Sequence, residues 1–146
     1  VFADYMQAYG EGGLRSLGLG ALDKLARLYW YTVEFGLVRE AGALRIYGAG
    51  IVSSFGESHF ALESDSPNRI GYSLERLLRT RYRIDDYQQV YFVIDSYEQL
   101  LRSTLDTDFA PLYKRLEPMP DLAPADVLAD DMVISRGDQT WAAAHI

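Results

Sequence analysis

The sequence predicts a mainly α fold with a short β-hairpin and a few small strands. Residues 25–37 are apolar or aromatic around nearly the whole circumference of a helix, which is typical of a buried helix. Two later segments repeat apolar residues at helical spacing, and one of them opens with a capping box. The alternating stretches between these segments are only long enough for short strands. A chain of 146 residues can bury one core.

The N-terminal part is expected to form two helices separated by a glycine-rich segment. Residues 1–9 carry apolar side chains at i, i+3, i+4 and i+7, which predicts an amphipathic helix. The side chains of this apolar face are Phe2, Tyr5, Met6 and Tyr9. Five glycines between residues 10 and 20 then predict a loop or a broken helix up to Ala21. The central helix follows over residues 21–35, and Gly36 lies near its end.

A hairpin is expected directly after the central helix. Residues 44–47 alternate Leu44 and Ile46 with polar neighbours, which predicts a strand. Gly48 and Gly50 interrupt that strand and indicate a bulge or a close backbone approach. Residues 53–56 are typical of a turn, and residues 58–62 are predicted as the returning strand.

The second half of the chain alternates helices with one short apolar strand. Residues 64–68 have loop chemistry, and Ser73 is placed to cap a helix over residues 73–82. Residues 90–94 predict a strand. Ser96 and Gln99 form a capping box that opens a helix over residues 97–105. Beyond residue 117 the chain becomes acidic and Pro-containing, with a short helical or strand-like segment only at residues 125–134.

Composition excludes several classes of partner and site. The net charge of -7 argues against nucleic acid and anionic membrane surfaces as partners. Because the chain contains no cysteine, it has no disulfide framework and no thiolate metal site, which suits a reducing cytoplasm. No apolar run approaches the roughly 20 residues that span a bilayer.

Glu34 is the one carboxylate on the central helix face formed by Ala26, Tyr29, Trp30 and Val33. If this face is buried, a bare carboxylate there is costly, and the negative end of the helix dipole adds to the cost. A proton, a cationic side chain or a metal ion would compensate. Spacing alone favours an ion pair. The candidate cationic partners are Arg27, Arg39 and Arg45.

Two segments resemble signatures of the pterin-dependent aromatic amino acid hydroxylases. Residues 29–37 read Tyr-Trp-Tyr-Thr-Val-Glu-Phe-Gly-Leu, and residues 47–57 read Tyr-Gly-Ala-Gly-Ile-Val-Ser-Ser-Phe-Gly-Glu, in the family's order and at its spacing. The resemblance runs over residues 1–116 and is strongest to the short bacterial members. It implies that residues 1–116 are the C-terminal part of the catalytic domain and that residues 117–146 are an acidic, Pro-containing tail of the same domain.

The resemblance implies a role for Glu34 as the single carboxylate of an iron(II) site that two histidines upstream of Val1 complete. Those histidines are outside this sequence. His59 and His145 lack the i, i+4 spacing that places two imidazoles on one helix face, so neither is assigned to a metal. From spacing alone, His59 is a plain strand residue and His145 belongs to a frayed end.

The resemblance also assigns ligand-binding residues. Trp30, Phe35, Gly50, Ser53 and Glu57 would bind the amino acid substrate, and Ser53 would share a catalytic role with Glu34 by orienting a ligand. Ala26 and Tyr29 would lie beside the pterin. Without the resemblance, the aromatic residues are ordinary core, Ser53 is a turn serine and Glu57 is a solvated turn carboxylate.

The activity implied is hydroxylation of L-phenylalanine to L-tyrosine with iron(II), a tetrahydropterin and O2. Tyrosine or tryptophan is the alternative substrate within the family. The intact enzyme is expected to be a cytoplasmic monomer, whereas the isolated chain would be incomplete and prone to associate. A different class of protein also fits the residues, namely a non-catalytic helical module in which Glu34 is buried and salt-bridged.

Overall fold

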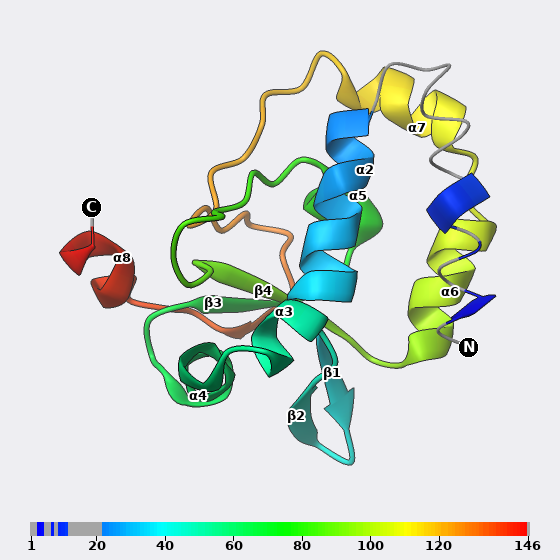
Figure 1. Cartoon of the computed structure of the whole chain (residues 1–146). Coiled ribbons are helices and arrows are strands. Elements are labelled where there is room, and N and C mark those ends of the chain that lie inside the picture. The colour runs from blue at the N-terminus through cyan, green and yellow to red at the C-terminus, as the bar shows by residue number, and fades with distance from the viewer. Residues whose placement is uncertain (1–2, 5–6, 8, 12–21, 146) are drawn as a thin grey trace.

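The computed structural model describes residues 3, 4, 7, 9–11 and 22–145. The predicted apolar residues Phe2, Tyr5 and Met6, and most of the glycine-rich segment, lie outside the described residues. Among the described positions, residues 9–11 are helical, so the first helix continues past Tyr9 into the segment predicted to be a loop. Figure 1 shows the described helical residues near the N-terminus, in dark blue, beside the helix α6, Tyr97–Leu105.

A mixed sheet lies at the centre of the described structure. Its strands are β1 (Leu37–Glu40), β2 (Ala43–Ile46), β3 (Asn68–Gly71), β4 (Val90–Ile94) and β5 (Val133–Ser135), in the order β2-β1-β4-β3-β5. β4 pairs in parallel with β1 and β3, while β2 and β5 are antiparallel edge strands. The prediction of a mainly α fold is therefore confirmed only in part: helical residues outnumber strand residues in the described structure, but the helices are arranged around a five-stranded sheet and the fold is mixed α/β.

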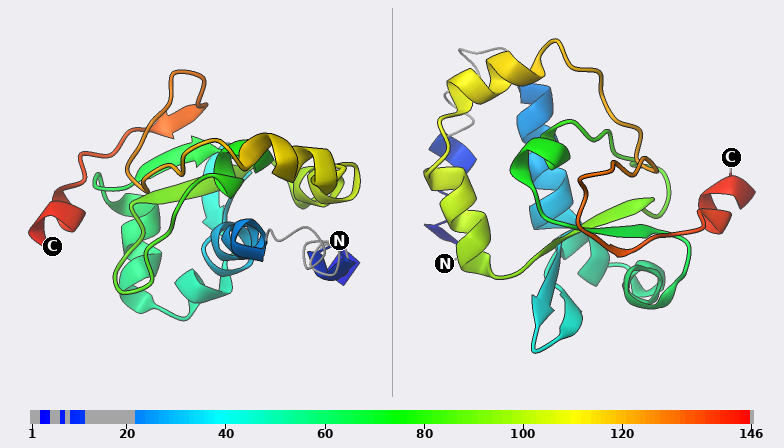
Figure 2. Two further views of the ribbon diagram at one scale, coloured as in Figure 1. Left: turned by 90° about the horizontal axis from the view of Figure 1, so that it is seen from above. Right: turned by 180° about the vertical axis from the view of Figure 1, so that it is seen from behind.

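Helices cover both faces of this sheet (Figures 1 and 2). On one face, α2 (Leu22–Tyr29), α5 (Leu74–Leu78) and α7 (Phe109–Leu116) share a core cluster with Val90 and Phe92. On the other face, α3 (Ala49–Val52) and α4 (Phe55–Glu63) enclose a second cluster with Tyr91 and Val93. Alternate residues of β4 thus enter two cores, which explains why the whole strand is apolar and buried.

The hairpin lies earlier in the chain than predicted. β1 and β2 form it, and Ala41 and Gly42 adopt positive φ angles of 50° and 79° at its tight turn. The predicted returning strand at residues 58–62 is instead the helix α4, with Ser54 at its N-cap. The Ser54 hydroxyl accepts a hydrogen bond from the Glu57 N–H, so Ser54 and Glu57 stand at the two ends of a capping-box motif.

Several predicted elements are confirmed. The central helix is α2 followed directly by a π-helical turn, η1 (Trp30–Glu34). β4 and α6 have the predicted bounds, and the Ser96 hydroxyl accepts from the Gln99 N–H as the capping box requires. The helix predicted over residues 73–82 is shorter, since α5 ends at Leu78, and Ser73 makes no side-chain cap.

The acidic tail returns to the sheet. β5 pairs with β3, and α8 (Thr140–Ala144) packs Trp141 against Tyr87 and Phe60. Within the segment predicted at residues 125–134, strand structure forms only at the end, where β5 begins. No helix in the part of the chain that the structure describes has the length and apolar character needed to cross a bilayer.

Candidate active site

The site is built on the last turn of the central helix, which is wider than an α-helical turn. The Phe35 N–H donates to the Trp30 carbonyl oxygen at 2.9 Å, an i to i+5 bond. Single π-helical turns inside α-helices occur frequently at functional sites. This turn places Glu34 and Phe35 where the helix ends and the hairpin begins.

The central helix is not buried on all sides as predicted, because its two faces differ in burial. Leu25 and Leu28, on the side opposite Glu34, are fully packed in the core, whereas Ala26, Trp30 and Glu34 are only half-buried. Tyr29, on the same helix face, is a hydrogen-bond partner of Glu34. Burial, followed by hydrogen bonding to Glu34, raises the pKa of the Tyr29 phenol.

Glu34 has no cationic partner among residues 22–145. Arg27 forms its ion pair with Asp121 at 2.9 Å, and Arg39 and Arg45 are exposed on the hairpin. The ion pair that spacing favoured, and with it the non-catalytic module held together by a salt-bridged Glu34, is therefore wrong for the described structure. Among the described residues, the Glu34 carboxylate shares a hydrogen bond with the Tyr29 phenol and forms no ion pair with a cationic side chain.

The glycines of α3 allow this short helix to lie directly against the end of the π-helical turn. A Cβ atom on Gly48 would stand 2.4 Å from the Glu34 carbonyl oxygen. A Cβ atom on Gly50 would stand 2.9 Å from Phe35 Cζ and 3.0 Å from Glu34 Oε2. The close backbone approach predicted for these glycines is thus confirmed, and it brings Gly50, Glu34 and Phe35 together.

Trp30 and Phe35 form an aromatic wall next to Glu34. Their ring centroids are 4.7 Å apart, and Tyr82 stacks on the other side of Trp30 at 4.5 Å with an interplanar angle of 15°. The Trp30 indole N–H donates to the Gln88 side-chain oxygen at 3.1 Å. Tyr82 and Gln88 come from the loop between α5 and β4, and no motif in the sequence pointed to either residue.

Ser53, Ala26 and Tyr29 lie around this centre. Ser53 is the exposed C-cap of α3, and its hydroxyl donates to the Gly50 carbonyl oxygen at 3.1 Å. Tyr29 is half-buried and packs against the Tyr9 ring at 5.4 Å. Ala26 lies one helical turn before Trp30 on the same half-buried face.

Glu57 faces the protein interior. The residue is 5% exposed, and its Oε2 accepts hydrogen bonds from the Tyr91 hydroxyl at 2.6 Å and the Gln88 N–H at 3.1 Å. Burial raises the pKa of the Glu57 carboxyl, and these two hydrogen bonds act in the opposite direction. The interpretation of Glu57 as a solvated turn carboxylate is therefore wrong.

Neither histidine belongs to this centre. His59 lies in α4 rather than in a strand, where it pairs with Glu63 at 3.5 Å. His145 is not frayed, because its ring stacks on Trp141 at 4.0 Å and its Nδ1 lies 2.7 Å from the Trp141 carbonyl oxygen. Across the described residues, no three His, Asp or Glu side chains gather into a group that could hold a metal ion. Glu34 can supply one ligand of a metal site.

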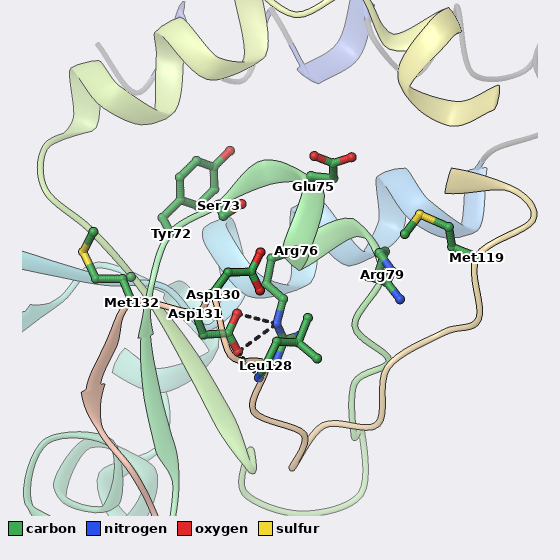
Figure 3. Close-up of a pocket in the computed structure, with 11 residues that line it drawn as sticks. Tyr72, Ser73, Glu75, Arg76, Arg79, Met119, Leu128, Asp130, Asp131 and Met132 are labelled. Atoms are coloured by element: carbon green, nitrogen blue, oxygen red, sulfur yellow. Dashed lines mark hydrogen bonds and ion pairs between the residues drawn. The ribbon is translucent and has the colours of Figure 1, made fainter. Parts of the chain in front are cut away.

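A separate pocket of about 430 Å³ lies between α5, the end of β3 and the tail (Figure 3). Inside it, Arg76 and Asp131 form an ion pair at 3.0 Å, with side chains 5% and 4% exposed. Arg76 also donates to the Asp126 carbonyl oxygen. None of the site residues predicted from the sequence lines this pocket, and its buried ion pair attaches the tail to α5.

Comparison with known proteins supplies the remaining information on this site. The model of the biopterin-dependent aromatic amino acid hydroxylase family matches residues 1–116. The chain belongs to this family of hydroxylases. The match includes Glu34 and every other site residue predicted from the sequence.

Two similar members of this hydroxylase family are bacterial proteins. The chain is 62% identical over 144 residues to a phenylalanine-4-hydroxylase of Caulobacter vibrioides, covering 99% of this chain and 49% of that protein. It is 61% identical over 143 residues to that of Ralstonia nicotianae, covering 97% and 45%. The chain therefore spans about half the length of the curated relatives it matches.

Solved structures of the family share the fold. The crystal structure of phenylalanine hydroxylase from Chromobacterium violaceum with iron and phenylalanine bound has a TM-score of 0.88 at 54% identity, covering 91% of this chain and 49% of that one. The cobalt-bound form of the same enzyme has a TM-score of 0.89 at 56% identity, covering 91% and 48%.

Proposed function

We propose that this chain is the C-terminal part of the catalytic domain of a phenylalanine 4-hydroxylase. The intact protein would convert L-phenylalanine to L-tyrosine with iron(II), a tetrahydropterin and O2. The observation that carries the proposal is the placement of the Glu34 carboxylate beside the aromatic wall of Trp30 and Phe35. The names of relatives at 61–62% identity support phenylalanine as the substrate.

Glu34 would be the protein's carboxylate ligand to iron(II). It fits this role because it is anionic, half-buried and without a cationic partner among residues 22–145. One carboxylate combined with two imidazoles is the ligand set of many non-heme iron oxygenases, and the described residues supply only the carboxylate. When bound, the iron and the pterin would supply the activation of O2.

The aromatic ring of the substrate would pack against Trp30 and Phe35. Aromatic pairs favour offset or edge-to-face packing. The rings of Trp30 and Phe35 are tilted by 34° to each other and together would form the apolar surface for the substrate ring. Gly50 keeps the space beside Glu34 Oε2 free of a side chain. Ser53, at the exposed end of α3, would orient a bound ligand through its hydroxyl.

The pterin would lie along the half-buried face that carries Ala26 and Tyr29. A phenol ring suits a flat heterocycle, and the small side chain of Ala26 leaves room beside it. The resemblance implies that Glu57 contacts the substrate. Since its carboxylate is occupied by Tyr91 and Gln88, its contribution would be indirect.

The tail, residues 117–146, would belong to the same domain as residues 1–116, as its pairing with β3 and its ion pairs with α2 and α5 suggest. We expect the intact protein to be a cytoplasmic monomer that acts on small molecules. The absence of cysteine and the charge of -7 support this view.

Product analysis of the intact protein tests the proposal. Iron-loaded protein would be supplied with a tetrahydropterin and O2, and with phenylalanine, tyrosine or tryptophan in parallel. We expect tyrosine to form from phenylalanine at a higher kcat/KM than the product of either other substrate. Preferred turnover of tyrosine or tryptophan would reassign the substrate, and no hydroxylation of any of the three would overturn the proposed function.

A further inference from the structure

The Glu57 carboxylate connects α4 to the loop that precedes β4. The Gln88 N–H and the Tyr91 hydroxyl both donate to Glu57 Oε2. Because burial and the neighbouring Glu57 raise the pKa of Tyr91, the phenol retains its proton and acts as the donor. The carboxylate therefore fixes the backbone position of Gln88, which is itself only 2% exposed.

The Gln88 side chain connects this loop to Trp30. Its oxygen accepts from the Trp30 indole N–H at 3.1 Å, and its nitrogen donates to the Arg83 carbonyl oxygen at 2.7 Å. The indole can only donate and the carbonyl can only accept, so this is the one orientation of the amide that satisfies both neighbours. Gln88 is thus held at its backbone by Glu57 and at its side chain by Trp30 and Arg83.

The hydrogen bond and the ring contacts constrain Trp30 in different ways. Stacking on Tyr82 sets the plane of the indole ring, because the two planes differ by only 15°. Stacking alone does not fix which edge of the ring carries the N–H, because a flip of about 180° about χ2 keeps the indole in nearly the same plane. The bond from the indole N–H to Gln88 excludes the flipped orientation and so determines which edge of Trp30 lies against Gln88 and which lies away from it.

We propose that Glu57 is a positioning residue that orients Trp30 through Gln88. Its consequence for substrate binding rests on the proposed function, in which Trp30 packs against the aromatic substrate. Two other roles for Glu57 predict different behaviour. A direct contact with the substrate's ammonium group needs the negative charge, whereas a purely structural role affects stability without moving Trp30.

A magnetic resonance experiment on the iron-free intact protein tests the connection without any activity. The Trp30 indole N–H resonance is identified as the one lost in Trp30→Phe. Glu57→Leu removes the acceptor for two buried donors and is expected to shift this resonance, whereas Glu57→Gln keeps an acceptor oxygen and is expected to restore it. The Trp141 indole donates to Asp86 in the same loop, so a shift confined to Trp30 separates loss of the Gln88 link from displacement of the whole loop.

Kinetics of the iron-loaded intact protein test the consequence. We expect Glu57→Leu to raise the KM for phenylalanine at least about fivefold and Glu57→Gln to stay within about twofold of wild type. In a Trp30→Phe background, Glu57→Leu is expected to add less than about twofold, because the indole N–H is already absent. Glu63→Leu, an exposed change in the same helix, is the matched control.

Three outcomes would overturn the proposal. An unmoved Trp30 resonance in Glu57→Leu would leave Glu57 without influence on the indole. If Glu57→Gln and Glu57→Leu raise the KM for phenylalanine equally, the negative charge of Glu57 acts directly on the substrate. If Glu57→Leu raises the KM for phenylalanine as much in the Trp30→Phe background as in wild type, Glu57 does not act through Trp30.

If Glu57→Leu does not fold, Gln88→Met tests the link between Gln88 and Trp30 by the same resonance. A Trp30 resonance that does not move in Gln88→Met also overturns the proposal. Absence of hydroxylation by wild type would count against the proposed function alone.

Discussion

At the scale of single residues, the charge of Glu34 is its most consequential property. Glu34→Gln in the intact protein preserves the shape of the side chain and removes the anionic ligand, so iron(II) affinity should fall by well over about tenfold. Iron titration of purified protein measures this effect. Glu40→Gln, which neutralises an exposed carboxylate on β1, should leave affinity unchanged. Full iron occupancy and normal turnover in Glu34→Gln would dismiss Glu34 as a ligand.

Gly50 is the second residue whose chemistry the site depends on. A methyl group there would lie 2.9–3.0 Å from Phe35 Cζ and Glu34 Oε2, so one of these groups must move. We expect Gly50→Ala to cost about 1–3 kcal/mol of stability and to weaken iron binding about tenfold in the intact protein. Gly10→Ala is the matched control, because nothing lies within 4 Å of its added methyl group. Wild-type iron affinity in Gly50→Ala would show that the Glu34 carboxylate is free to adjust.

At the scale of elements, local sequence signals predicted helices well wherever caps and apolar spacing agreed. The capping box at Ser96 gave α6 its bounds, and the continuous apolar run gave the central helix. The same type of signal at Ser54 and Glu57 marks the start of α4, yet the turn predicted at residues 53–56 led to the prediction of a returning strand at residues 58–62. The cap decides here, because it satisfies a backbone N–H that would otherwise be orphaned at the start of a helix.

The contact between α2 and the tail gives a prediction about pH. Hydrogen bonding to Arg27 holds the pKa of Asp121 below its ordinary value of 3.8. The pair therefore stabilises the fold above the unfolded-state pKa, and this stability is lost as the pH falls through the lower, folded-state pKa. In the intact protein, Asp121→Asn should lower the urea midpoint at neutral pH, and its difference from wild type should shrink as the pH falls below 3.8 and vanish once Asp121 is protonated in the folded state. A constant difference at every pH would contradict this account, and exposed Asp130→Asn is the control.

At the scale of the whole molecule, the sequence underestimates the sheet because β3 has no apolar pattern. Its Asn68 and Arg69 are buried, and their polar groups are satisfied by distant parts of the chain. Asn68 bonds to Ala125 and Gly137, and Arg69 to carbonyl oxygens of α4. These partners exist only after folding, so no local rule detects the strand. No local rule detects Gln88 at the site either, because its partners Glu57 and Trp30 are also distant in the sequence. By contrast, the resemblance of residues 29–37 and 47–57 was enough to predict that Glu34, Phe35 and Gly50 belong to one site.

Under the proposed function, two ligands of the iron site lie outside this chain, which leads to a prediction for residues 1–146 alone. A single carboxylate has no geometric preference for iron, and the described residues contain no three-ligand group. Beside the site, Phe55 is 83% exposed and Val52 65%, and exposed apolar surface favours association. The isolated chain should therefore bind iron(II) poorly, fail to hydroxylate phenylalanine and self-associate. Sedimentation, iron content and product assays beside the intact protein measure this. A monomeric chain that binds iron stoichiometrically and turns over would mean that the remaining ligands lie within these 146 residues.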